Sequence, residues 1–147
     1  MRKFKVLKVI LIVSLLFFLW QELLPVKVIG IHKPGTTSTV VVVKNFPITR
    51  EGKIRWWEKN RLQLQQKFPF IGSPQNHRVL FFVSSYRKNH GTDEDSDLLC
   101  FKDMASEKNC ISKENRPLVV WYNPDGSIEY DTEYFLNVFF AACSCQR

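Results

Sequence analysis

Histidine, acidic and cysteine side chains are the groups in this 147-residue sequence that could do chemistry. The three histidines, His32, His77 and His90, lack the i, i+4 spacing that places two metal ligands on one helix face. The sequence has no G-x-S-x-G, phosphate-loop or dinucleotide-binding motif. We therefore predict no catalytic residue, no cofactor and no metal site, and we expect a protein that is not an enzyme.

A hydrolase of the cell envelope, or a small-ligand binder with an unrecognised site, is the alternative. In the hydrolase, His77 or His90 would act with a carboxylate from residues 93–97, because these groups are near one another in the sequence. The same acids invite a calcium hypothesis. An EF-hand loop needs a glycine after its third ligand, whereas Gly91 precedes the acids here. A solvated loop is the preferred interpretation.

Four cysteines allow three disulfide connectivities. Cys100 and Cys110 enclose a short loop that can bring their sulfur atoms together. Their spacing does not match the paired motifs of zinc sites or of redox-active thiols. We predict a structural disulfide between Cys100 and Cys110, of the kind that forms outside the cytoplasm. The partners of Cys143 and Cys145 stay open.

The N-terminal residues have the pattern of an uncleaved signal-anchor. Basic residues precede an uncharged run from Val9 to Trp20. A helix over residues 4–24 is about 30 Å long, which is enough to cross the hydrocarbon core of a bilayer. The basic flank stays cytoplasmic by the positive-inside rule. We predict a single-pass inner-membrane anchor at residues 1–24, in contact with the lipid bilayer through residues 4–24.

Residues 25–147 would then form an exported, periplasmic domain. A cleaved signal peptide is the main rival to the anchor, but residues 20–26 offer no small-x-small cleavage site. A lipoprotein would need a cysteine directly after the apolar run, and the first cysteine is Cys100. A buried core helix would hardly begin with Arg2, Lys3, Lys5 and Lys8.

The hydropathy pattern of the exported part predicts an α+β fold: a small, mainly antiparallel sheet of about five strands with one packed helix. Residues 26–31 and 39–44 predict a hairpin whose second strand is the more central and buried. The turn Asn123-Pro-Asp-Gly126 joins two further strands. The remaining strand candidates are residues 78–85, 116–123 and 127–130, with a short apolar segment at 98–101.

One soluble helix is predicted over residues 50–67, with Thr49 as N-cap and Glu51 in the first turn. Its apolar stripe consists of Ile54, Trp57, Leu64 and Phe68. The other faces would carry Lys53, Arg55, Glu58, Lys59, Gln63 and Gln66. Trp56 lies beside the stripe, either as a partly buried edge residue or as a possible interaction surface. We expect Trp57, Leu64 and Val79–Val83 in the core.

The C-terminal residues Tyr134–Ala142 are apolar but too few to cross a bilayer as a helix. They fit a last core strand or an exposed, aggregation-prone end. The basic residues downstream of the anchor are spread among acids rather than gathered on one face with stacking aromatics. No nucleic acid is expected as a partner.

Three stretches resemble a known family. They are the basic-apolar start with Pro25–Ile29, then Val43–Thr49 with Gly52–Trp57, then Leu99–Met104 with Glu107–Cys110. Over about residues 1–130, the chain resembles the enterobacterial membrane proteins of unknown function. The resemblance implies a small membrane-anchored protein and supplies no activity, substrate or catalytic residue.

The anchor, the small α+β domain and the lack of a chemical motif favour a protein-interaction module of the cell envelope. Its partner would be an unknown envelope protein. One specific version is an immunity-type protein that blocks a toxin acting in the periplasm. This version is motivated by size, export and tethering alone.

Overall fold

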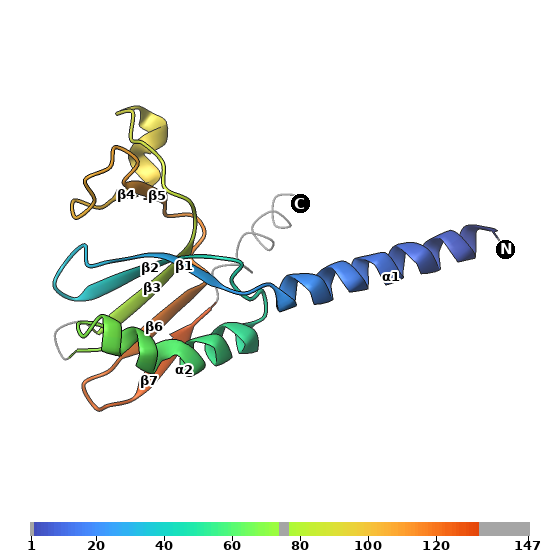
Figure 1. Ribbon diagram of the computed structural model, residues 1–147, viewed down its shortest axis with the longest axis horizontal. Helices are drawn as coiled ribbons and strands as arrows, with labels where there is room; N and C mark the ends of the chain where they lie inside the picture. Colours follow the sequence, from blue (N-terminus) through green and yellow to red (C-terminus); the bar gives the residue numbers. More distant parts are fainter. Residues whose placement is uncertain (1, 74–76, 133–147) are drawn as a thin grey trace, which may run out of the picture.

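A computed structural model describes residues 2–73 and 77–132 (Figure 1). The helix α1 (Arg2–Leu23) extends away from a folded domain. Its segment Lys3–Gln21 is long and apolar enough to cross a membrane, and 0% of it is buried. A core helix of a soluble protein buries an apolar face. Because α1 is fully exposed, it is not a core helix of the folded domain, and its apolar surface is suited to contact with lipid.

The domain is built on a five-stranded sheet with the order β1-β2-β3-β6-β7. Its strands are β1 (Lys27–His32), β2 (Ser38–Lys44), β3 (Arg78–Val83), β6 (Leu118–Tyr122) and β7 (Ile128–Asp131). The pair β2–β3 is parallel and the other three neighbouring pairs are antiparallel. The sheet is thus mixed but mainly antiparallel, and the α+β prediction is confirmed.

Both predicted hairpins are present. The strands β1 and β2 pair antiparallel, and β6 and β7 pair antiparallel around Asn123–Gly126. Gly126 has φ +85°, a conformation that glycine adopts without strain. As predicted, β2 is the more central strand of its hairpin, and every residue from Ser38 to Val43 is buried.

The helix α2 (Arg50–Lys67) is the crossover between the parallel strands β2 and β3 and covers one face of the sheet (Figure 1). Thr49 caps it as predicted, because the Thr49 side chain accepts a hydrogen bond from the Gly52 backbone N–H at 3.1 Å. Trp57 is fully buried in the core under α2, and Leu64 packs partly buried against the same cluster. That cluster includes Val41, Val43, Val79, Phe81, Leu118 and Val120.

The prediction that Lys53 lies on an outward face of α2 is wrong. Lys53 is only 4% exposed. Residues four apart in a helix share a face, so Lys53 lies on the same side as the buried Trp57. The buried face of α2 is therefore centred on Lys53 and Trp57, and Ile54 is only half-buried.

The opposite face of the sheet packs under a second, smaller lobe. It contains the one-turn helix η1 (Asp93–Asp97) and the short antiparallel strands β4 (Leu98–Cys100) and β5 (Cys110–Ser112). Phe101 and Ile111 of this lobe join Val40, Val42 and Phe82 in a second core cluster. Successive valines of β2 thus point to opposite faces, as strand geometry requires. The sequence pattern missed β5.

Candidate functional site

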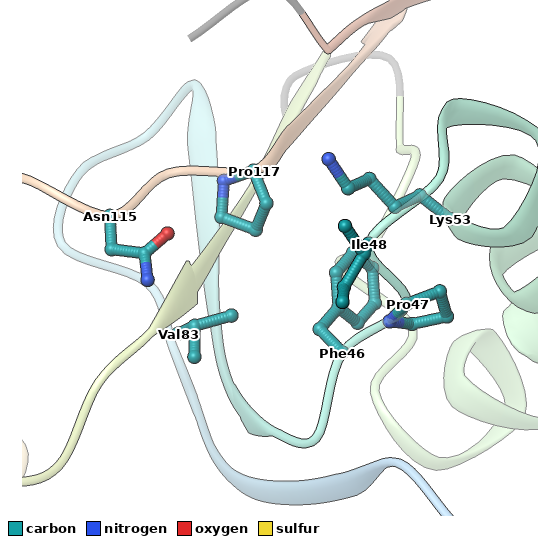
Figure 2. Close-up of a pocket in the computed structure, with 7 residues that line it drawn as sticks. All are labelled: Phe46, Pro47, Ile48, Lys53, Val83, Asn115 and Pro117. Atoms are coloured by element: carbon teal, nitrogen blue, oxygen red, sulfur yellow. The ribbon is translucent and has the colours of Figure 1, made fainter. Parts of the chain in front are cut away.

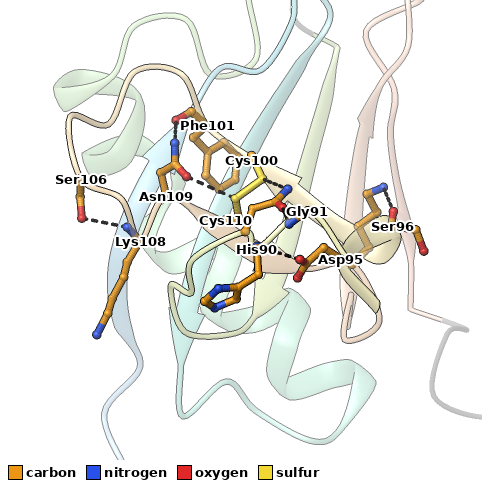
Figure 3. The surroundings of a disulfide bond; sticks show 12 residues. His90, Gly91, Asp95, Ser96, Cys100, Phe101, Ser106, Lys108, Asn109 and Cys110 are labelled. Carbon is orange, nitrogen blue, oxygen red and sulfur yellow. Dashed lines mark hydrogen bonds between the residues drawn. A yellow bond between two sulfur atoms is a disulfide. The ribbon is translucent and has the colours of Figure 1, made fainter. Parts of the chain in front are cut away.

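The lobe is closed by a disulfide between Cys100 and Cys110, the pairing expected from the sequence (Figure 3). The two cysteines face each other across the β4–β5 ladder. Cys110 also forms a backbone bridge with Arg87, which follows β3. The disulfide therefore holds the lobe together at the point where it joins the main sheet. Cys143, Cys145 and residues 134–142 lie outside the described part of the chain.

A cluster of side chains around His32 connects the lobe to β1. His32 is buried at the end of β1, and its ring stacks on Phe101 with 3.9 Å between centroids. Its Nδ1 lies 2.8 Å from Asp103 Oδ2, and its Nε2 lies 2.6 Å from the Tyr86 hydroxyl. Burial, and then the charge of Asp103, raise the pKa of Tyr86. Both ring nitrogens of His32 are within hydrogen-bond distance of a partner, so neither is available to a substrate. The cluster therefore joins the β4–β5 lobe to the main sheet.

Gly30 makes room for this cluster. A Cβ atom on Gly30 would lie 1.8 Å from the Tyr86 hydroxyl oxygen and 2.9 Å from His32 Nε2. Any other residue at position 30 would therefore displace Tyr86 from His32. Sequence reasoning missed the cluster because His32 and Asp103 are 71 positions apart, and no local motif joins them.

The structure places His90 near Asp95, one of the acids of the alternative hydrolase site, but that carboxylate is bound within its own loop. The carboxylate of Asp95 accepts hydrogen bonds from the Thr92 backbone N–H, the Thr92 hydroxyl and the His90 backbone N–H. These bonds, the one from the Thr92 backbone first, hold the pKa of Asp95 below its ordinary value. The Asp95 carboxylate thus stabilises its own loop. The charge of His90 also lowers the pKa of Asp95, but the His90 ring has no hydrogen bond to the described side chains of Asp93, Asp95 and Asp97.

His77 lies elsewhere. It lines a hollow of about 700 Å³ together with Trp121 and Tyr122. None of Asp93, Asp95 and Asp97 lines this hollow. Among the described residues, no group of three or more His, Cys, Asp or Glu side chains could hold a metal ion.

An apolar pocket lies beside the connection from β2 to α2, at the edge of the sheet face that α2 covers (Figure 2). Its volume is about 200 Å³. The lining residues are Phe46, Pro47, Ile48, Lys53, Val83, Asn115 and Pro117. They come from the β2–α2 connection, from α2, from the end of β3 and from the segment before β6. The pocket is therefore held by the central elements of the fold.

Lys53 provides the charge of this pocket. Its side chain extends from α2 toward Pro117 (Figure 2). Burial lowers the pKa of Lys53 because the charged form loses solvation. A buried amine can act as a nucleophile when a base stands beside it, but the described lining has no second titratable group. The arrangement fits recognition of an acceptor oxygen better than covalent chemistry.

Trp56 is a half-buried edge residue. Its ring makes edge-to-face contacts with Phe46 and Phe81, at centroid distances of 5.5 and 6.1 Å. Its other side lines a groove of about 420 Å³ between α2 and the end of α1. The structure thus gives Trp56 both a packing contact and a solvent-facing surface.

Comparison with known families adds a decisive observation. The chain matches the family described as "enterobacterial putative membrane protein" over residues 1–137. It belongs to this family. The match confirms the resemblance carried by the three sequence stretches, and together with α1 it makes the chain a membrane protein of a family of unknown function. No curated protein and no solved structure matches the chain.

Proposed function

We propose that the chain is a single-pass inner-membrane protein whose folded domain lies in the periplasm and binds another envelope protein. Membership of a membrane protein family and the fully exposed α1 support the anchor. The Cys100–Cys110 disulfide supports an oxidising compartment for the domain. The basic residues before the apolar run support a cytoplasmic N-terminus.

Fusion to alkaline phosphatase, which is active only outside the cytoplasm, tests this topology. An enzyme joined after residue 30 should be active, because α1 would carry it across the membrane. A fusion joined after Lys8, which lacks the apolar run, should be inactive and provides the control. Inactivity of the fusion after residue 30, with the fusion protein present in cells, would contradict the topology.

The pocket beside Lys53 is the observation that carries the binding proposal. Sites for small ligands usually span about 300–1,000 Å³, and this pocket has about 200 Å³. Such a size suits one apolar side chain. Protein interfaces obtain most of their binding energy from a few anchor residues that fill well-packed, desolvated pockets. We therefore assign the pocket to an apolar anchor residue of a partner protein.

The polar groups at the pocket define the partner further. Lys53 and Asn115 are the polar side chains of the lining. An ammonium group only donates hydrogen bonds, so the atom placed against Lys53 is an acceptor oxygen. A backbone carbonyl or a carboxylate next to the apolar anchor meets this requirement. Ile48, which is 51% exposed, extends the apolar surface at the rim.

Crosslinking in intact cells, followed by purification and mass spectrometry, tests the binding proposal. Ile48→Glu places a charge at the rim and should lower recovery of the envelope partner by roughly tenfold or more, as for an interface anchor. Leu62→Glu is the matched control, because Leu62 is 65% exposed on α2 and does not line the pocket. Equal partner recovery with both variants, at equal abundance of the protein, would overturn the assignment of the pocket.

The identity of the partner comes from the same experiment. A toxin that acts in the periplasm would support the immunity-type version of the proposal. A resident envelope protein would support a role in envelope assembly or maintenance instead. Both results keep the binding function and differ only in the process that it serves.

A further inference from the structure

The groove between α1 and α2 is separate from the pocket beside Lys53. One wall is the end of α1 and the segment that follows it, with Gln21, Leu24, Pro25 and Val26. The other wall is mainly one face of α2, with Gly52, Arg55, Trp56, Lys59 and Asn60. Asn45 and Pro47 complete the lining. Because the end of α1 and the segment directly after it form one wall, the groove lies where the membrane helix ends and has a defined depth relative to the bilayer.

That depth is the layer of lipid headgroups. The apolar segment of α1 ends at Gln21, and Leu24 follows three residues later. Three residues extend a helix by about 4.5 Å. The headgroup layer on each side of the hydrocarbon core is about 5–8 Å thick. The groove therefore opens where headgroups lie, on whichever side of the membrane the domain is placed.

Two cations line the described part of the groove. Arg55 and Lys59 are exposed, and the described lining contains no carboxylate. Neither cation has an ion pair with a side chain that the structure describes, whereas Arg61 on the same helix pairs with Glu58 at 3.0 Å. These two charges are thus available to an external anion.

The types of side chain match a phospholipid headgroup. A guanidinium group binds phosphate oxygens with two parallel hydrogen bonds. An indole ring favours the membrane–water interface, where one part of the ring contacts apolar groups and another part contacts water. Arg55, Trp56 and Lys59 all line the groove, and Lys59 is a helix-surface neighbour of both Arg55 (four residues away) and Trp56 (three residues away).

We propose that this groove binds the phosphodiester headgroup of an anionic phospholipid in the leaflet where α1 ends. Arg55 and Lys59 bind the phosphate, and Trp56 contacts the region between headgroup and acyl chains. Binding would press the N-terminal half of α2 against the membrane surface. The domain would then have a defined orientation on the bilayer, in addition to its tether.

Photo-crosslinking of the full chain in reconstituted vesicles tests this proposal. The vesicles contain phosphatidylglycerol with a diazirine in its headgroup or, in a separate arm, phosphatidylcholine labelled in the same way. Adducts are mapped by mass spectrometry. We expect adducts within residues 50–61 with phosphatidylglycerol and few with phosphatidylcholine. Each cation near an anionic surface contributes roughly fivefold to binding, so Arg55→Gln with Lys59→Gln should lower the adduct yield by roughly 25-fold.

Two further variants separate charge from structure. Arg55→Lys with Lys59→Arg keeps both charges and should keep the adducts. Lys102→Gln with Lys108→Gln removes the same charge from exposed positions in the β4–β5 lobe, which lies away from α1 (Figure 1), and should also keep them. Any of three results would overturn the proposal. They are equal adducts from the two lipids, an unchanged adduct yield in the Arg55 and Lys59 glutamine variant, and an equal loss of adducts in the Lys102 and Lys108 variant.

Discussion

Lys53 combines a cost in stability with a role in the proposed interface. Its charged form loses solvation on folding, which lowers its pKa below the value of 10.5 in the unfolded chain. The folded state is therefore penalised wherever the unfolded chain is protonated, including neutral pH, and the penalty shrinks as the pH rises toward 10.5. Lys53→Met removes this pH-dependent penalty, so its free energy of unfolding relative to the native chain should be higher at pH 7 than near pH 10, and the variant should bind the partner more weakly.

The pH dependence distinguishes this explanation from a simple packing effect. Chemical denaturation of the full chain in detergent, at pH 7 and near pH 10, should show that the free energy of unfolding of Lys53→Met, relative to the native chain, falls at the higher pH. Lys102→Met, at an exposed position, should change the free energy of unfolding by less than about 0.5 kcal/mol. The same difference between Lys53→Met and the native chain at both pH values would contradict a lowered pKa of Lys53 in the folded state.

The His32 cluster should contribute to stability rather than to catalysis. Tyr86→Phe removes the hydroxyl that bonds His32 Nε2 and should cost about 1 kcal/mol. Gly30→Ala should cost at least as much, since its Cβ occupies the position of the same hydroxyl. In the double variant, much of the clash is relieved, so the two costs should not add. If denaturation shows that the two costs add, the Cβ at position 30 and the Tyr86 hydroxyl do not compete for the same space.

At the scale of single residues, the sequence pattern predicted those roles that depend only on neighbours in the chain. Thr49 as N-cap and Trp57 as a core residue follow from helix geometry within a few positions. The burial of Lys53 could not be predicted, because it depends on how α2 is rotated over the sheet. The contact of His32 with Asp103 depends on the lobe folding back onto β1.

At the scale of elements, the β4–β5 lobe depends on its disulfide. The two strands have three residues each and form few ladder hydrogen bonds. Replacing Cys100 and Cys110 by serine should cost about 2–3 kcal/mol, as for closure of a short loop. Hydrogen exchange should then increase in residues 98–112 more than in α2. Equal increases in the lobe and in α2 would contradict a local role of the disulfide.

The sequence predicted the longer elements and missed the short one. α2 and the two hairpins have clear caps, periodicity or turn residues, so their positions are set by neighbours in the chain. The strand β5 (Cys110–Ser112) is too short to show an alternating pattern. The parallel pairing of β2 with β3 joins segments separated by a whole helix, and no local signal specifies such a pairing.

At the scale of the whole molecule, the tether determines what the domain can reach. α1 holds the folded part within reach of the bilayer surface, and the cationic groove opens on the side of α1. The pocket beside Lys53 lies at the connection from β2 to α2. A partner bound there would meet the domain close to the membrane. This geometry favours a membrane protein, or a protein acting at the membrane surface, as the partner.

Site-specific photo-crosslinking in living enterobacterial cells is the most direct test of the binding function. A photoreactive phenylalanine replaces Ile48 in the full chain, and in a matched variant it replaces Leu62. Illumination should join the protein to one envelope partner from position 48, with little or no adduct from position 62. No adduct from position 48, or the same adducts from both positions, would contradict a pocket that binds a partner protein.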